Sequence, residues 1–520
     1  MKKYTYFLLT LVLGFAITGC ADLEEDARSL LEPDERVLSL ESVETTLAGA
    51  YGHLDARAFL SRGLGLTIML RSDMVDIGNP STAPDRIEHD QFTTSTTNPL
   101  ILNPSNPDRS FWPRMYQIVR GSNETLLELA LLEEQSPQDP AITIEMQARA
   151  RFLRGFAYYH LVRLFGDVPF LDENTTTADA TVAPRMNADD IYERIIEDFQ
   201  FAQQNLAVTQ SNRAVPGQSA ACAFLASVYL TRGDFQLAYN EATNVINNAG
   251  TFNLELEPDY RNIFHAVNTD NSLEPIFVID FVGTNINDES RDYLAAFTGF
   301  FGQATYYPSG GWSVMVPAQA VFDDWDDRDY RKEVNFDAEA VDNNGNILPF
   351  TAFSSLDGRN ANRPHISKYT AMAGDLPQAN TSGRDSHSNY QMMRYAEVLL
   401  IAAEAAIELG LTSEADEYIN MVRERARNGD GSEEPSALPQ DISGATIADV
   451  LEERRLELAF EHKRWYDIVR REMGPQVFGP NGFETEFQGT QNFDPSRDYL
   501  LPIPPLEIAN NPNLTQNPGY

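Results

Sequence analysis

The sequence predicts a mainly helical protein, a helical-repeat scaffold that carries a large irregular, loop-rich region and a few short strands. Long segments place apolar residues at the spacing of one helix face. Two of them share one pattern of small residues around a glycine. Between residues 251 and 391, short β-branched and aromatic runs stand among Gly, Asn, Asp and Pro clusters, which is typical of loops with a few strands.

The N-terminus predicts export. Lys2 and Lys3 precede an apolar run, 6–17, that is too short to span a bilayer as a permanent helix. The following residues, up to Cys20, resemble the lipobox of bacterial lipoproteins, in which the cysteine is acylated and becomes the mature N-terminus. We therefore expect residues 1–19 to be a lipoprotein signal peptide and 20–35 to be an acylated N-terminus with an acidic tether. A plain secretory signal with an incidental cysteine is the alternative.

Composition narrows the range of partners. The 520 residues include 39 Lys and Arg against 77 Asp and Glu, a formal net charge of -38. Such a polyanion is repelled by nucleic acid and by anionic lipid, so we expect no nucleic-acid partner. The same charge also serves simply to keep the surface soluble. Apart from Cys20 there is one cysteine, Cys222, and its apolar helical surroundings predict a small buried side chain.

Periodicity places the elements along the chain. Helices are predicted over 111–132, 143–165, 219–248, 392–427 and 446–471, with a further one opened by Asp189 and Asp190 and carrying apolar positions from Ile191 to Leu206. A strand is predicted over 275–282.

An internal repeat links two of these helical segments. When Gly233 is aligned with Gly410, small or apolar residues match in register on both sides. The matched pairs are Ala226 with Ala403, Leu230 with Ile407, Ala238 with Ala415, Ala242 with Ile419, and Val245 with Val422. This is the spacing of tetratricopeptide helix hairpins, in which small residues let two helices approach closely.

The sequence lacks a phosphate-binding loop, a nucleophile elbow and a zinc-type histidine pair. We therefore predict no catalytic residue, no cofactor and no metal site. The acidic run 323–327 suits either a hard cation or a solvated helix start, and we favour the helix start. A glycoside hydrolase is an alternative function, because two carboxylates can cleave a glycosidic bond when their spatial separation is suitable, and the sequence does not give that separation.

Motifs from end to end of the chain resemble the SusD/RagB family of outer-membrane nutrient-binding lipoproteins. They are ARARFLRGFAYY with LFGDVP (148–169), RYAEVLL with AAEA (394–405), ERRLELAFE before RWYD (453–467), and LPIP with QNPGY (501–520). The resemblance implies a SusD-like fold of tetratricopeptide-like helix pairs. It divides the chain into an N-terminal helical part, 36–250, and a C-terminal part, 251–520. The latter comprises a loop-rich 251–391, a helical 392–471 and a terminal 472–520.

The same resemblance implies a binding function without chemistry. It implies a surface-exposed lipoprotein of the outer membrane that captures oligo- or polysaccharide for a SusC-like TonB-dependent transporter. A peptide-binding RagB-like member is the alternative, followed by the glycoside hydrolase and a purely structural repeat adaptor. We interpret the residues of these motifs as scaffold, with Arg454, Arg455 and Glu457 in internal ion pairs and Trp465 and Tyr466 packed inside.

Side-chain chemistry predicts the ligand face. Sugar rings stack their apolar faces on Trp and Tyr, and their hydroxyls bond to Asp, Asn, Arg and His. The aromatic stretch 297–312 is interleaved with glycines and looks exposed, so we predict glycan contacts from Trp312, Tyr306 and Tyr307. A second loop, 73–109, adds Asp73, Arg86 and His89. Ordinary packing is the alternative role for each aromatic residue.

Overall fold

The computed structural model describes residues 38–56, 59–265, 271–281, 292–300, 311–341, 346–352, 363–369, 389–429, 436–479, 482 and 492–520. The chain divides into a short unit, residues 1–40, and a large one, residues 41–520. Cys20 and the rest of the predicted signal and tether lie outside the described residues. The description below concerns the large unit.

Helices dominate, as predicted. In chain order they are α2 (Leu40–Tyr51), α3 (Leu64–Leu70), α4 (Pro84–Asp90), α5 (Phe111–Gln135), α6 (Pro140–Phe165), α7 (Thr177–Ala180), α8 (Ala188–Asn205), α9 (Gln218–Arg232), α10 (Phe235–Asn247), α11 (Ala249–Phe252), α12 (Leu294–Thr298), α13 (Gln319–Asp324), α14 (Tyr330–Asn335), α15 (Tyr395–Glu408), α16 (Thr412–Asn428), α17 (Ile447–Glu457), α18 (Arg464–Arg470), α19 (Gly474–Val477) and α21 (Pro505–Asn510), with short 3-10 turns at Pro107–Arg109, Tyr260–Ile263 and Phe350–Ala352.

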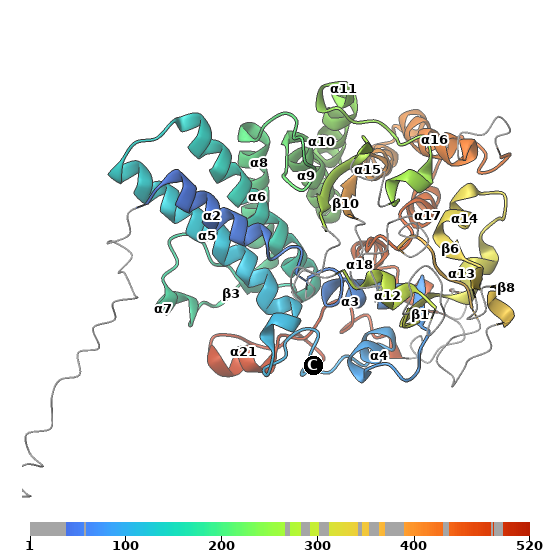
Figure 1. Ribbon diagram of the computed structural model, residues 1–520, viewed down its shortest axis with the longest axis horizontal. Coiled ribbons are helices and arrows are strands. Elements are labelled where there is room, and N and C mark those ends of the chain that lie inside the picture. The colour runs from blue at the N-terminus through green and yellow to red at the C-terminus, as the bar shows by residue number, and fades with distance from the viewer. Residues whose placement is uncertain are drawn as a thin grey trace, which may run out of the picture. The chain divides into compact units, whose positions relative to one another are not determined.

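The long helices pack in a continuous series. Helix α5 packs on α6, α6 on α8, α8 on α9, α9 on α10, and α10 on α15, which also contacts α16 and α17 (Figure 1). Capping residues fix several starts: Asp139 accepts a hydrogen bond from the amide of Ala141, and Asn187 from that of Asp189. The series is a scaffold of paired antiparallel neighbours.

The predicted repeat is confirmed. Gly233 and Gly410 each end a helix in the left-handed region, at φ +80° and +76°, which a residue with a β-carbon adopts only with strain. The matched small and apolar residues are buried between the helices of each hairpin, apart from Ile407, which is half-buried. Although the copies are far apart in sequence, α10 and α9 pack directly on α15. The loop-rich region therefore leaves the helical array between these two segments and returns to it.

Strands are short and pair two by two among the described residues. The antiparallel pairs are β1 (Val75–Ile77) with β5 (Met315–Pro317), β2 (Val168–Pro169) with β3 (Arg185–Met186), β4 (Pro275–Ile279) with β10 (Tyr390–Arg394), β6 (Phe336–Asp337) with β9 (His365–Ile366), and β7 (Glu339–Val341) with β8 (Ile347–Pro349). The predicted strand over 275–282 is confirmed as β4. Apart from β2–β3, which lies in the N-terminal part, each pair includes at least one strand of the loop-rich region.

Two predicted helices need correction. The segment 392–427 begins as strand β10 before α15 starts at Tyr395, because its first residues pair with β4. The segment 446–471 breaks between α17 and α18, where Phe460 and His462 both have φ +62°. Backbone carbonyls exposed by this break are used elsewhere: that of Ala459 accepts from Lys368, and that of Phe460 from the Tyr369 hydroxyl.

The acidic run 323–327 also differs from its prediction. Asp323 and Asp324 are exposed, as expected of solvated residues, but they end α13 instead of opening a helix. The next helix, α14, starts three residues beyond the run and is capped by Asp329, whose carboxylate accepts from the amide of Arg331.

A buried network of charges joins the loop-rich region to the helices. Glu457 of α17 accepts hydrogen bonds from Arg394, Arg425 and Arg331, the first at 2.6 Å and the last at 3.1 Å. Its neighbours in the network are Glu274, Lys368, Glu453 and Glu461. The predictions that Arg454, Arg455 and Glu457 form internal ion pairs and that Trp465 and Tyr466 are packed are confirmed. Cys222 is buried, as predicted.

Candidate ligand-binding site

Backbone hydrogen bonds hold Trp312 and its two neighbours in place. Its amide donates to the carbonyl of Ala296 at 2.6 Å, and the amides on either side, Gly311 and Ser313, donate to Phe300 and Gly299 at 2.6 and 2.9 Å. Gly311 is required there, because a β-carbon would lie 2.2 Å from the backbone of Gly299. The segment is thus fixed against the C-terminal end of α12.

The indole of Trp312 is half-buried. One side packs against aromatic rings: its centroid lies 5.2 Å from that of Phe297, at 67°, and 5.9 Å from that of Tyr293. The indole N–H makes no hydrogen bond to any described residue. An amphipathic ring that is rigidly held and partly open suits stacking on a sugar.

The remainder of the described aromatic stretch corrects our expectation of an exposed loop. Phe297 is fully buried, as a residue of helix α12, and Phe300 is 1% exposed. Phe300 stacks on the buried imidazole of His365, with ring centroids 3.7 Å apart. Apolar rings with such partners gain more from packing than from exposure, so these two phenylalanines belong to the core. Tyr306 and Tyr307 lie outside the described residues, and their role stays a prediction.

Arg86, on α4, reaches the same place. Its guanidinium carbon lies 5.0 Å above the ring of Phe297, and Nη1 donates to the hydroxyl of Thr82 at 2.6 Å. Asn79 completes the group, because its side-chain amide donates to the carbonyl of Trp312 at 3.4 Å. The structure therefore brings together Arg86 and Trp312, two predicted site residues that are 226 positions apart in the sequence.

Asp73 and His89, predicted with Arg86, are placed differently. Both are 0% exposed, so neither is available to a ligand in this structure. Asp73 forms a bidentate ion pair with Arg464 at 2.7 and 2.8 Å, which ties the end of α3 to α18. His89 lies between the hydroxyls of Thr67 and Thr94, and burial lowers its pKa to about 3, so the imidazole is neutral. Their polar groups contact partners in the protein interior, and we leave both residues out of the proposed ligand face.

Two positioning residues were missed by sequence reasoning. Ser313, at φ +48°, shares a hydrogen bond of 2.6 Å with Nε2 of His365. Burial lowers the pKa of His365 to about 3, and its Nδ1 donates to the carbonyl of Arg363, so Nε2 accepts from the serine. No sequence signal marked this contact, because it joins residues 52 positions apart in an irregular region.

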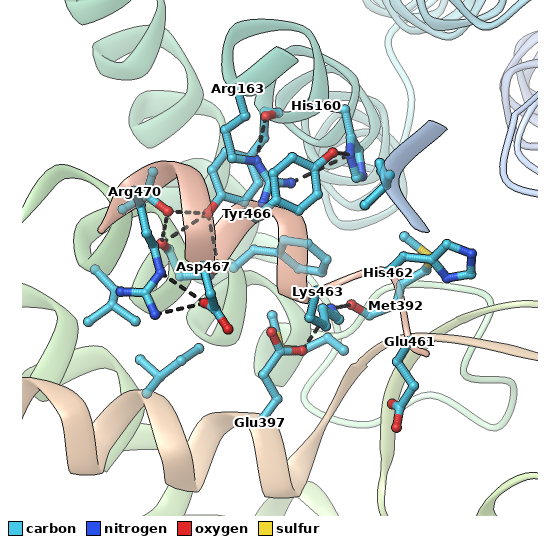
Figure 2. A pocket seen from close by; sticks show the side chains of 18 of the residues that line it. His160, Arg163, Met392, Glu397, Glu461, His462, Lys463, Tyr466, Asp467 and Arg470 are labelled. Carbon is cyan, nitrogen blue, oxygen red and sulfur yellow. Dashed lines mark hydrogen bonds and ion pairs between the residues drawn. The ribbon is translucent and has the colours of Figure 1, made fainter. Parts of the chain in front are cut away.

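A small cavity lined by both apolar and polar side chains lies elsewhere, between α6, α9, α15 and α18 (Figure 2). Tyr466 bonds to Nδ1 of His160 at 2.9 Å, and Lys463 lies between the carbonyl of Met392 and the carboxylate of Glu397. Burial lowers the pKa of His462 to about 3, so this histidine is neutral. The volume is about 40 Å³, whereas small-molecule pockets hold roughly 300–1,000 Å³. The cavity admits water-sized molecules and excludes a sugar.

A surface groove of about 320 Å³ lies between α5 and α6, and its lining has no aromatic side chain. It therefore lacks the group that recognises a sugar ring. Within the described ranges, no cluster of three or more His, Cys, Asp or Glu side chains is arranged around a metal position. The same residues include no helix with the length and apolar character needed to cross a bilayer.

Comparison with known proteins defines the class. Residues 336–520 match the SusD family, and residues 69–230 match a family described as starch-binding and associating with the outer membrane. The SusD-like protein P2 of Formosa agariphila is 42% identical over 525 residues, which cover 100% of both chains. The starch-binding protein SusD of Bacteroides thetaiotaomicron is 25% identical over 439 residues and 75% of each chain.

Solved structures share the fold. A SusD homologue from Bacteroides thetaiotaomicron superposes with a TM-score of 0.77 at 19% identity, over 94% of this chain and 98% of that one. The surface glycan-binding protein A of the same species, in complex with laminarihexaose, gives 0.74 at 20% identity, over 92% and 100%. A laminarin-binding SusD-like protein gives 0.73 at 20% identity, over 92% and 99%.

The helical-repeat scaffold with an irregular region inserted in it, together with the family matches, places the chain among the SusD-like binding proteins, which are non-catalytic. With a full-length relative at 42% identity, the assignment is direct. The chain belongs to the SusD family. The resemblance found in its motifs, the mainly helical fold and the absence of an enzymatic role expected from it are confirmed.

Proposed function

We propose that this chain is a surface lipoprotein of the outer membrane that captures oligo- or polysaccharide and delivers it to a SusC-like TonB-dependent transporter. Family membership supports a binding role. Relatives named for starch and for laminarin, and a matched family described as associating with the outer membrane, support a glycan ligand at that membrane. The ligand face on this chain is proposed around Trp312, with Arg86 and Asn79 beside it and Tyr306 and Tyr307 as further predicted contacts.

The observation that carries the proposal is the mounting of Trp312. Three consecutive amides, from Gly311 to Ser313, are bonded to the backbone at and beyond the end of α12, so the indole loses little freedom when a ligand binds. Its half-buried ring already packs on Phe297 and keeps an open part for a second flat, apolar surface. The unbonded indole N–H is a donor for a sugar hydroxyl.

The test is a titration of the purified protein with oligosaccharides from a glycan array, comparing wild type with Trp312→Ala. Stacking contributes on the order of 1–3 kcal/mol by analogy with bases on aromatic rings, so we expect roughly a tenfold to hundredfold weaker Kd. Tyr239→Ala, which removes a half-buried aromatic ring from α10 on the helical scaffold, is the matched control and should leave the Kd unchanged.

Melting curves accompany the titration. Unchanged affinity with a lowered melting temperature in Trp312→Ala would make the indole a packing residue and reject this ligand face. If wild type binds no glycan but retains peptides from a peptide library, the RagB-like alternative replaces glycan capture. Hydrolysis of any bound glycan, detected as the release of new reducing ends, would contradict the non-catalytic role.

A further inference from the structure

The ligand face contains a cation that a neutral sugar does not require. Arg86 lies over one face of Phe297 at 5.0 Å, and the Trp312 indole contacts the same ring at a centroid distance of 5.2 Å. The guanidinium and the indole are therefore at most about 10 Å apart. Neighbouring residues of one oligosaccharide can reach both groups.

Arg86 has no acidic partner among the described residues. No carboxylate of that part of the chain forms an ion pair with it, and its hydroxyl partner, Thr82, is uncharged. The carboxylate of Asp85 accepts from the backbone amide of Arg86, at 3.1 Å, and not from its side chain. Nε is buried and makes no hydrogen bond to a described residue.

Several buried arginines of the scaffold, by contrast, are paired with carboxylates. Arg331 and Arg394 are fully buried and each contacts at least two carboxylates. Arg154 is likewise paired with Asp198 and Glu173. Such pairing offsets the cost of removing a guanidinium from water. Arg86 bears part of that cost with no ion pair among the described residues: burial lowers its pKa, the charge of Asp85 raises it, that of Arg62 lowers it, and the group stays protonated at neutral pH.

We propose that the captured glycan is anionic, and that Arg86 binds its carboxylate or sulfate ester while Trp312 stacks on a neighbouring ring. This inference rests on the proposed glycan-binding function and adds the chemical class of the ligand. A planar guanidinium offers parallel N–H donors that match both oxyanions, and that of Arg86 is already held over the ring of Phe297, which limits its freedom. The net charge of -38 does not decide the matter, because charges beyond a Debye length of about 8 Å are screened at physiological salt.

Paired probes test the charge directly. Polygalacturonate is compared with its carboxyl-reduced form, a sulfated carrageenan with its desulfated form, and laminarin serves as a neutral glycan. We expect wild type to bind at least one anionic probe about tenfold or more tighter than its neutralised counterpart, the size of one charge-assisted hydrogen bond. The pair that shows the preference tells a carboxylate ligand from a sulfate ligand.

Variants assign the preference to Arg86. Arg86→Gln should bring the two members of that pair to within about threefold of each other, because it weakens binding of the charged probe much more than binding of the neutralised probe or laminarin. Arg86→Lys should keep only part of the preference, because lysine retains the positive charge but lacks the planar pair of N–H donors. Trp312→Ala should weaken both members equally. Arg120→Gln, an exposed arginine on α5 paired with Glu124, is the control and should change neither.

Each other outcome is decisive. Equal or tighter binding of every neutralised probe by wild type overturns the anionic ligand and leaves glycan capture intact. Equal weakening of charged and neutral probes in Arg86→Gln, with a lower melting temperature, makes Arg86 a structural support of Phe297 and also overturns it. Absence of binding to any glycan, charged or neutral, rejects the proposed function itself.

Discussion

Glu457 is a single carboxylate on which three arginines of different elements converge. Arg394 ends β10, Arg425 lies on α16 and Arg331 on α14, and all four side chains are almost or fully buried. These cations hold the pKa of Glu457 down to about 2, against the effect of burial. Removing this one charge leaves buried arginines without full compensation.

We therefore expect Glu457→Gln to lower the free energy of unfolding by about 3–5 kcal/mol, the cost of breaking a buried ion pair. Urea unfolding followed by circular dichroism measures it. Glu452→Gln, on the same helix, is the matched control: Glu452 is 44% exposed and pairs with Arg455, so its loss should cost no more than about 1 kcal/mol. Equal effects of the two variants would refute a special role for the buried network.

The same carboxylate predicts a direction of acid sensitivity. Because the folded-state pKa of Glu457 is depressed from 4.5, its stabilisation is present above the unfolded pKa and is lost as the pH falls from about 4.5 to 2. Melting temperatures measured across that window should fall in wild type. They should fall less steeply in Glu457→Gln, which has no proton to bind at this position.

Single residues also show what sequence reasoning could reach at the ligand face. Trp312 and Arg86 were selected by their chemistry, and they lie together. Asp73 and His89 have equally suitable chemistry. However, Asp73 is paired with Arg464, 391 positions away, and His89 lies between two threonines. A residue type says which bonds are possible, and long-range packing determines which of them are made.

At the scale of elements, the two repeat hairpins depend on glycine at the same turn. A β-carbon at Gly410 would meet no atom within 4 Å, and at Gly233 only Phe235 at 3.9 Å, so the requirement is one of backbone conformation and not of space. We expect Gly233→Ala and Gly410→Ala each to lower the free energy of unfolding by about 1–2 kcal/mol.

Gly49→Ala is the control for that pair. Gly49 lies inside helix α2, and a β-carbon there also meets nothing within 4 Å. Alanine in a helix interior is better than glycine by roughly 0.5–1 kcal/mol, so this variant should be more stable than wild type. Thermal and urea unfolding of the three variants would contradict the turn assignment if all shifted in the same direction.

Element types were predictable where periodicity was long, and element ends were not. Helices α5 and α8 match their predicted segments because an apolar face runs through each, and α6 matches although residues 152–162 are buried all round. The break before α18 could not be predicted from residues 446–471. It depends on Lys368 and Tyr369, which bond to the carbonyls of Ala459 and Phe460 from another part of the chain. In the same way, Phe297 and Phe300 look like loop aromatics until their partners are known.

At the scale of the whole molecule, the proposed transporter should be found with this chain. This prediction rests on membership of the SusD family. Mild detergent extraction of native membranes, followed by affinity purification of the tagged chain, should recover a large TonB-dependent barrel in stoichiometric amount. An unrelated outer-membrane lipoprotein carrying the same tag is the control. Recovery of the chain alone in several mild detergents would contradict the partnership.

The attachment of the molecule to its membrane is predicted to depend on one atom, the sulfur of Cys20. Cys20 follows the short apolar run of the predicted export signal. Two or more acyl chains hold a protein stably where one gives only marginal binding. Cys20→Ala should therefore move the protein from the outer-membrane fraction to soluble fractions, and its glycan affinity should be unchanged, because the predicted tether separates the lipid from the ligand face. Cys222→Ala, which removes the buried cysteine, should stay at the membrane. If Cys20→Ala remains membrane-bound at the wild-type level, the anchor is something other than lipid on this cysteine.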